Sequence, residues 1–392
     1  MPTETQHQLA VSQIAPDVVQ SEIRAMSVEC ALLPHGINMA QGVCDTDPPH
    51  PVVAGAIQAI EDGFNIYTRL NGIDSLRHAI AARLAQRDGW HVNADTEVLV
   101  TSGTTGALHA ACLALLNPGD EVIVFEPFYG YHISTLLSMR LKPVIVPLEG
   151  RDRELDPARL AAAITSRTRA IILNTPSNPS GKVFTRAELE GIASVAIREN
   201  LFVFTDEIYE YFLYDGAQHI SLAQLPGMAE RTITMSGFSK TFSVTGWRLG
   251  YLIADPKWIP AISYFHDLIY VCAPSPLQHG AAVGLLTLPG SFYTDLALEY
   301  QQKRDDICSA LTVAGLTPHI PNGSYYVLAD ATHIAGETAK IKARTLLRET
   351  GIATVAGTAF ISGSGGENLL RFCYAKKDAD LAEACRRLRA LA

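Results

Sequence analysis

Short, apolar, β-rich runs that alternate with helix-like segments constrain the fold of this chain more than any other feature. A strand that is apolar along its whole length is buried on both faces, as in a parallel sheet enclosed by helices. The pattern therefore predicts an α/β fold whose large domain holds a mostly parallel seven-stranded sheet between helices. The seven runs span residues 98–100, 121–125, 144–146, 170–173, 201–204, 232–235 and 249–254.

The pattern changes after residue 288, where we expect a second, smaller α+β domain. Its predicted elements are a long polar helix over 291–314, strands over 323–327 and 369–373, and helices over 341–347 and 381–388. We therefore divide this part of the chain into a large domain, 46–288, and a C-terminal small domain, 289–392. Within the large domain, Thr185 and Glu188 have the spacing of a capping box at a helix start.

The amino-acid composition indicates which partners and which cellular compartment to expect. The net charge of −9 argues against a nucleic acid or an anionic membrane, both of which attract basic surfaces. The seven cysteines are odd in number and scattered without a C-x-x-C pair, which is typical of a reduced, cytoplasmic protein. No apolar run is long enough to span a bilayer, and residues 1–20 lack the features of a signal peptide. We expect no metal site.

A lysine in a tight Gly/Ser loop is the first candidate for chemistry. Lys240 follows the strand-like run 232–235 and lies among small and hydroxyl residues. A lysine held in this way can lose its proton and form a Schiff base, whereas most lysines are simply solvated. Arg248, eight positions later, carries the permanent charge and forked geometry that suit a phosphate group.

The segment from Ser236 to Tyr251, Ser-x-x-Ser-Lys-Thr-x-x-x-Thr-Gly-Trp-Arg-x-Gly-Tyr, resembles the pyridoxal-phosphate lysine motif of the class I aminotransferases. These are fold-type I enzymes of the aspartate aminotransferase superfamily. Further motifs follow in the family's order from about Asn38 to Tyr374. The resemblance implies that Lys240 bears pyridoxal 5'-phosphate. It also implies that residues 1–45 form an N-terminal arm belonging to the small domain.

The resemblance assigns the phosphate end of the cofactor to a strand-to-helix turn. Gly103, Thr104 and Thr105 lie at that turn, where free N–H groups of a helix start suit a phosphate. A threonine in this place is otherwise only a helix cap. Gly237 stands where many relatives have serine, so Ser239 and Ser236 are the candidates for a phosphate hydroxyl.

The same resemblance assigns four contacts to the cofactor ring. Tyr129 would stack on the ring, Asn178 would bind its hydroxyl, and Tyr209 would donate to the same oxygen. Asp206 would keep the ring nitrogen protonated, which gives this acidic residue at the end of a buried strand the partner that it needs. Glu207 points the other way on a strand and is assigned a structural role.

Substrate contacts follow from three further motifs. Arg371, in the apolar run Leu-Leu-Arg-Phe-Cys, would clamp the substrate α-carboxylate, with Gly42 and Asn178 beside it. Cys44 stands where relatives often have proline, so substrate choice is expected to differ. Tyr67 would cross a dimer interface to the phosphate of the partner. No match exists for the second arginine of aspartate-specific enzymes, which favours neutral or aromatic amino acids.

Together these features predict a homodimeric, pyridoxal-phosphate-dependent aminotransferase with shared active sites. It would move the amino group of an L-amino acid to a 2-oxo acid. A β-lyase or an amino-acid oxidase on the same fold is the main alternative, because the cofactor motifs are shared. A pyridoxal-sensing regulator behind a DNA-binding module is less favoured, since the chain is acidic and has little room before Asn38.

Overall fold

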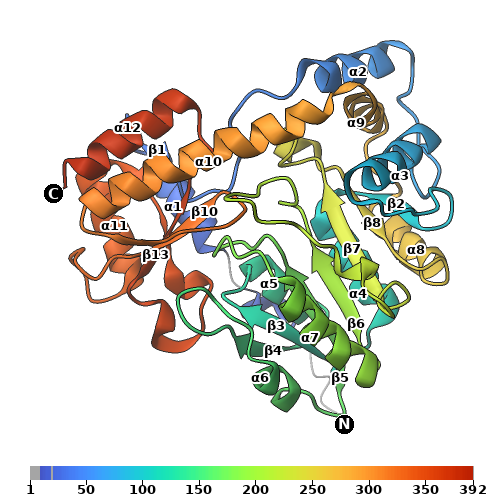
Figure 1. Ribbon diagram of the computed structural model, residues 1–392, viewed down its shortest axis with the longest axis horizontal. Coiled ribbons are helices and arrows are strands. Elements are labelled where there is room, and N and C mark those ends of the chain that lie inside the picture. The colour runs from blue at the N-terminus through green and yellow to red at the C-terminus, as the bar shows by residue number, and fades with distance from the viewer. Residues whose placement is uncertain (1–8, 19–20, 392) are drawn as a thin grey trace, which may run out of the picture.

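The computed structural model describes residues 9–18 and 21–391. A large sheet enclosed by helices forms one part of the molecule, and a smaller α+β part lies beside it (Figure 1). Each predicted apolar run coincides with one strand of the large sheet, with ends shifted by a few residues. The strands are β2 (Val98–Thr101), β3 (Glu121–Glu126), β4 (Lys142–Pro147), β5 (Thr168–Asn174), β6 (Phe202–Asp206), β7 (Thr232–Gly237) and β8 (Gly250–Ile253).

The large sheet has the strand order β2-β8-β7-β6-β5-β3-β4. Neighbouring strands from β7 through β4 are parallel. Strand β8 is antiparallel to both of its neighbours, β2 and β7. The predicted fold class, a mostly parallel seven-stranded sheet between helices, is thus confirmed.

Both faces of this sheet are buried, which explains the continuous apolar runs. Val122 and Val124 pack in the core under the helices on one face, whereas Ile123 and Phe125 pack in a separate core on the other. Successive side chains of a strand point to opposite faces, so each apolar residue has a core to enter. The helices of this part are α2 (His50–Glu61), α3 (Asp74–Asp88), α4 (Gly103–Leu115), α5 (Gly130–Ser138), α6 (Pro157–Ala162), α7 (Arg186–Arg198), α8 (Ile259–Tyr270) and α9 (Ser275–Thr287).

The smaller part is built on a four-stranded antiparallel sheet, β12-β13-β10-β9. The N-terminal segment joins it, because β1 pairs in parallel with β11 through Ile37 and Ile352. This arrangement supports the division at residues 45 and 288, whose limits stay a prediction. The elements are α1 (Glu22–Ala31), β1 (Ile37–Asn38), α10 (Gly290–Val313), β9 (Thr317–His319), β10 (Tyr326–Asp330), α11 (Ala339–Thr350), β11 (Ile352–Ala353), β12 (Val355–Ala356), β13 (Leu369–Cys373) and α12 (Asp378–Arg389).

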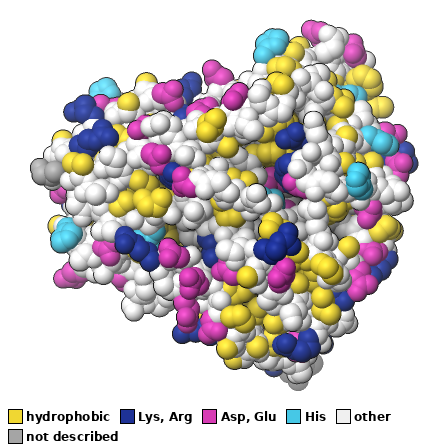
Figure 2. Space-filling view, in the orientation of Figure 1, with side chains coloured by type: hydrophobic (Ala, Val, Ile, Leu, Met, Phe, Trp, Pro, Cys, Tyr) yellow, Lys and Arg dark blue, Asp and Glu magenta, His cyan; other side chains and the backbone are white. Residues whose placement is uncertain are grey.

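The cysteines and the surface charges bear on the predicted compartment and partners. All seven cysteines are free thiols, and the cytoplasmic location inferred from them stays a prediction. Acidic and basic side chains are interspersed on the face seen in Figure 2. Within the described ranges, no single helix is long and apolar enough to cross a bilayer; α9 and α10 pass that test only together, with a 96° bend between them.

Candidate active site

A polar cavity lies at the carboxyl edge of the large sheet, where the smaller part of the molecule meets it. Asn174 and Asp206 end the adjacent parallel strands β5 and β6 at this edge, where ligands of open α/β sheets usually bind. Apart from Gly103, Tyr67 and the alternative candidate Ser236, every residue predicted for the site lines this cavity. They are Gly42, Thr104, Thr105, Tyr129, Asn178, Asp206, Tyr209, Ser239, Lys240, Arg248 and Arg371.

Lys240 follows β7 and directs its amine into the cavity. Its Nζ donates a hydrogen bond to the carbonyl of Gly42 at 2.9 Å, and it forms no ion pair within residues 9–18 and 21–391. Burial is the largest effect and lowers the pKa of Lys240; Cys44 and Cys373 oppose it, Arg248 adds a smaller lowering effect, and Asp206 opposes it weakly. The Lys240 amine is therefore easier to deprotonate than that of a solvated lysine.

Arg371 enters the same cavity from β13 and is fully buried. It donates to Asn178 Oδ1 at 2.8 Å and to the carbonyl of Ala40, while its Nε has no partner. Its guanidinium lies over the rings of Tyr326 and Phe360, 4.4 and 4.7 Å from their centroids. No carboxylate pairs with it in the described part of the chain, so a buried cation is available to an anionic ligand.

Asp206 at the end of β6 is buried and paired with a histidine that the sequence analysis missed. His132 Nε2 lies 3.0 Å from Asp206 Oδ2, and the His132 ring stands edge-on to Tyr129 at 5.3 Å. Both Tyr129 and His132 come from the start of α5, one helical turn apart. That spacing was the available signal, although a lone histidine on a helix is usually not a site residue.

The start of α4 and the loop carrying Arg248 form a second polar corner. Gly103 has a φ of +72°, and a Cβ there would lie 3.0 Å from an Arg248 terminal nitrogen, so glycine suits both the turn and the close approach. Arg248 itself has a left-handed φ of +53° and donates to the carbonyl of Thr245 at 3.0 Å. The corner thus combines a helix N-terminus, the hydroxyls of Thr104 and Thr105, and a guanidinium.

The structure excludes one hydroxyl candidate and gives another a neighbour. Ser239 lines the cavity, but Ser236 turns away and donates to Glu210 Oε1 at 2.7 Å, which removes it as a phosphate candidate. Tyr209 lies within hydrogen-bond distance of the Tyr326 hydroxyl, at 3.0 Å. Sequence reasoning missed Tyr326, because its place beside Tyr209 depends on the contact between two parts of the fold.

Tyr67 lies outside the cavity and is 76% exposed. Exposed large apolar side chains are numerous around it, in residues 57–70, and also in α8, in residues 264–270. The Gln278 side-chain amide links the two segments, donating to Thr68 Oγ1 at 3.3 Å and to the Ala273 carbonyl at 2.8 Å. The large exposed apolar side chains of these two segments are Ile57, Ile60, Phe64, Ile66, Tyr67, Leu70, Tyr264, Leu268, Ile269 and Tyr270.

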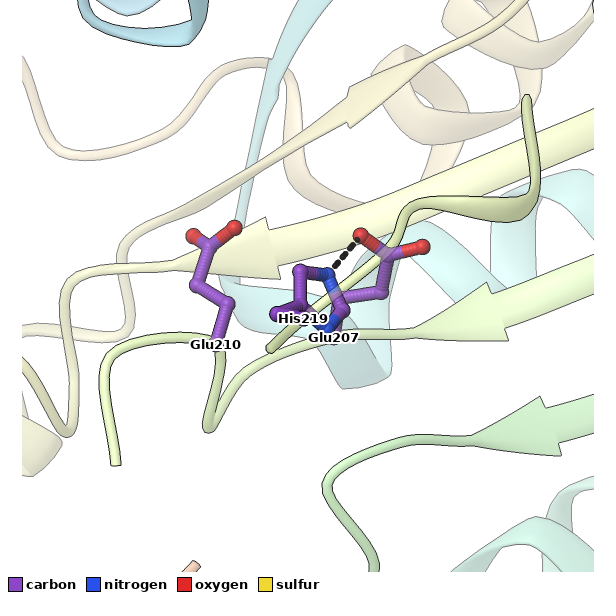
Figure 3. A group of neighbouring side chains, drawn as sticks. All are labelled: Glu207, Glu210 and His219. Carbon is purple, nitrogen blue, oxygen red and sulfur yellow. Dashed lines mark hydrogen bonds and ion pairs between the residues drawn. The ribbon is translucent and has the colours of Figure 1, made fainter. Parts of the chain in front are cut away.

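Glu207, Glu210 and His219 form a buried cluster close enough to hold a metal ion (Figure 3). Protein donors already occupy the carboxylate oxygens. His219 and Ser221 bind the two oxygens of Glu207 at 2.7 and 3.0 Å, and Arg87 pairs with Glu210, which also accepts from two hydroxyls. The cluster is an internal ion-pair network, consistent with the structural role predicted for Glu207.

The donors around the cavity fit a phosphorylated pyridine aldehyde. The corner at α4 offers the cationic and N–H groups that bind a phosphate. Asp206 offers a carboxylate for a protonated ring nitrogen, and Lys240 offers an amine whose lowered pKa suits attack on a carbonyl. The unpartnered Nε of Arg371 leaves a place for a further anion.

Comparisons with known proteins agree with this chemistry. The family model "Aminotransferase class I and II" matches residues 34–388. The kynurenine–oxoglutarate transaminase of Dictyostelium discoideum is 36% identical, and the alignment covers 89% of each chain. The solved structure of N-succinyldiaminopimelate aminotransferase from Mycobacterium tuberculosis is 35% identical, with a TM-score of 0.94 over 98% of this chain and 100% of that one. An Escherichia coli protein with a methionine aminotransferase function is 31% identical, with a TM-score of 0.93 over 98% and 100%.

Proposed function

The chain belongs to the class I and II aminotransferases, which are pyridoxal-phosphate-dependent enzymes, and from this premise we propose how its cavity handles an amino acid. Such enzymes transfer the amino group of an amino acid to a 2-oxo acid. One observation carries the proposal. Lys240 and Arg371 both hydrogen-bond to carbonyls of the short segment 40–42, so a buried amine and a buried guanidinium reach one cavity.

The cofactor phosphate would bind at the corner formed by the start of α4, Ser239 and Arg248. Asp206, held by His132, would pair with the ring nitrogen, and Tyr129 would cover one ring face. When bound, pyridoxal phosphate supplies an electron sink for the carbanion at the substrate α-carbon. The pairing with His132 would fix the orientation of the Asp206 carboxylate, so that its charge stays on the ring nitrogen.

Arg371 would bind the substrate α-carboxylate and thereby set the position of the α-carbon. Its guanidinium is already oriented by Asn178 and by Ala40. Lys240, as a neutral amine, would take the proton from the α-carbon as general base and return it as general acid. Its lowered pKa brings the amine closer to the working pH, where such exchange is fastest.

The amino donor would be a neutral or aromatic L-amino acid rather than aspartate. Arg248 and Arg371 are the arginines of the cavity, and in the described ranges no further arginine lines it for a second carboxylate. Tyr129, Tyr131, Tyr326 and Ile23 supply aromatic and apolar surface instead. The similar proteins include kynurenine, methionine and aromatic aminotransferases at 31–36% identity and aspartate aminotransferases at 29–30%, so the choice of donor rests on the cavity lining.

Arg371→Lys tests the carboxylate role. Lysine cannot form the paired fork, so amino acids should bind more weakly by on the order of 2–5 kcal/mol. Amines without a carboxylate should be poor substrates of the wild type and barely affected by the change. Steady-state constants for phenylalanine, methionine, glutamate and aspartate, beside those for amines without a carboxylate, test both the role of Arg371 and the preference for neutral or aromatic donors. Equal use of amines and amino acids would refute the role of Arg371, and a strong preference for aspartate would refute the pocket argument.

The same assay separates the alternative chemistries. An aminotransferase needs a 2-oxo acid acceptor for sustained turnover, whereas a β-lyase or an oxidase makes keto acid without one. When the acceptor is withheld, formation of the keto acid should therefore stop after about one molecule per active site. Continued turnover without an acceptor would favour the alternatives.

Two chains would assemble into a two-fold dimer with shared active sites. The exposed apolar side chains of residues 57–70, Tyr67 among them, support this, since large exposed apolar surface often marks an interface. Sedimentation velocity across a range of concentrations should give twice the chain mass. A species that stays monomeric and fully active on dilution would contradict the proposal.

A further inference from the structure

A second hollow, separate from the cofactor cavity, lies where three segments meet. The turn after β4 contributes residues 151–153, the loop after Asn178 contributes residues 180–182, and the β9 region contributes residues 318–322. The hollow has a volume of about 290 Å³ and a mainly polar lining. This size suits a small ion with its water rather than a large cofactor.

Two arginines and a histidine of this hollow have unused hydrogen-bonding groups. Arg153 makes no side-chain hydrogen bond or ion pair with any described residue, and its Nε is shielded from solvent without an acceptor. Arg151 has a single weak bond, to the Pro318 carbonyl at 3.4 Å, and His319 Nδ1 is also buried without a partner. Lys182 differs, because its Nζ forms an ion pair with Glu188 Oε1 at 2.7 Å. Buried donors of this kind normally have an acceptor.

The walls of the hollow are tightly constrained. Arg153 has a left-handed φ of +57°, rare for a residue with a side chain, in a turn closed by reciprocal 2.8 Å backbone bonds between Glu149 and Glu154. Opposite, Gly181 has a φ of +69°, and a Cβ there would lie 2.1 Å from Pro321 Cβ. The loop of the large part and the β9 region are therefore in direct contact, and the donors have defined positions.

Two arginines line the hollow with one carboxylate, Asp152, and two carboxylates outside the lining also act on it, Glu126 on Arg153 and Asp330 on His319. Burial lowers the pKa of His319 to about 4, and the Arg153 and Arg151 guanidinium groups lower it further, against smaller opposing effects of Asp330 and Asp152. His319 is therefore neutral near pH 7 and takes part as a hydrogen-bonding ring rather than as a cation. Two guanidinium groups remain to attract an anion.

We propose that this hollow binds a phosphate group, held by Arg151, Arg153 and the His319 ring. Forked guanidinium groups match the oxygens of phosphate, and its double charge exceeds that of chloride. The bound group would bridge the loop of residues 180–182 to β9. Because that loop begins just after Asn178, which accepts a hydrogen bond from Arg371, the anion would also steady one wall of the active site.

The test uses the holoenzyme, so that the cofactor phosphate occupies the corner at Arg248. Inorganic phosphate and methyl phosphate are each titrated by calorimetry at constant ionic strength, with chloride as the balancing ion. We expect saturable binding to the wild type, weakened at least tenfold in Arg153→Gln and in Arg151→Gln. Binding of both probes would indicate the phosphate group of a larger ligand, and binding of inorganic phosphate alone would indicate the free ion.

Arg169→Gln is the matched control, because Arg169 is an exposed arginine whose guanidinium binds backbone carbonyls of its own segment, outside the hollow. It should bind phosphate as the wild type does. Absence of saturable binding to the wild type would overturn the proposal. So would equal binding by wild type, Arg153→Gln and Arg151→Gln, provided that far-ultraviolet circular dichroism shows all of them folded.

Discussion

Lys240 is a partly buried amine whose charged form is less favoured in the folded chain than in the unfolded chain. Its pKa is lowered by burial, so the unfolded chain binds the proton more tightly than the folded chain does. This cost to stability is fully present below the folded pKa and disappears as the pH rises through the unfolded value of about 10.4.

Replacing Lys240 by methionine should therefore stabilise the cofactor-free enzyme near neutral pH. The gain should shrink as the pH approaches 10, because lysine then costs nothing in the folded state. Urea unfolding of both apoenzymes across this pH range measures the effect. An advantage that grows with pH would contradict the assigned direction of the pKa.

Asp206→Asn should keep the fold and reduce kcat by roughly 10²-fold or more, since an amide cannot hold the ring nitrogen protonated. His132 Nε2, 3.0 Å from the Asp206 carboxylate, would still find an amide oxygen there, which favours retention of the structure. Turnover and the visible spectrum of the bound cofactor are the measurements. Near wild-type turnover would show that Asp206 is not the partner of the ring nitrogen.

The place of a residue in the site was predictable where the residue belongs to a local motif, whereas contacts between distant segments were not predictable. Lys240 and Arg248 belong to one continuous motif, and the structure brings them to one cavity. Ser236 and Ser239 were indistinguishable in sequence, and only the packing of β7 against Glu210 separates them. His132 depends on α5 packing against the end of β6, which no local pattern encodes.

At the scale of elements, α7 begins with the capping box that the sequence predicts. Thr185 Oγ1 accepts from the Glu188 backbone N–H at 3.3 Å, and the Glu188 carboxylate accepts from the Thr185 N–H at 2.8 Å. Thr185→Ala should lower the free energy of unfolding by about 1 kcal/mol. Thr185→Ser keeps the hydroxyl and is the matched control, and chemical denaturation compares the three proteins. Equal loss in both variants would exclude the cap as the cause.

The strands were predictable for a physical reason, but their order was not. A strand that is buried on both faces is apolar at successive positions, as in residues 170–173 of β5, and such a run can be recognised in the sequence. The antiparallel direction of β8 could not be predicted in this way, because an antiparallel strand between two buried neighbours is as apolar as a parallel one. Strand order depends on the connections, which run through helices whose faces are compatible with several arrangements.

At the scale of the whole molecule, the shared-site dimer predicts complementation between two defective chains. Tyr67→Ala lacks the group proposed to reach the partner's cofactor, and Lys240→Ala lacks the catalytic amine. In a mixed dimer, one site would hold an intact Lys240 together with an intact Tyr67 of the partner. Co-expressed chains, purified with two different tags, should therefore be more active than either variant alone. Failure of the mixed dimer to regain activity would place the role of Tyr67 within its own subunit.

The hydrogen bonds that Arg371 makes to Asn178 and to Ala40 have a consequence for the thermodynamics of binding. A flexible arginine loses much rotational freedom when it grips a ligand, but here that entropy is lost when the chain folds. The guanidinium is preorganised, so substrate affinity depends on the integrity of the backbone at residues 40–42. Loosening that short segment would weaken substrate binding without removing a single group that touches the substrate.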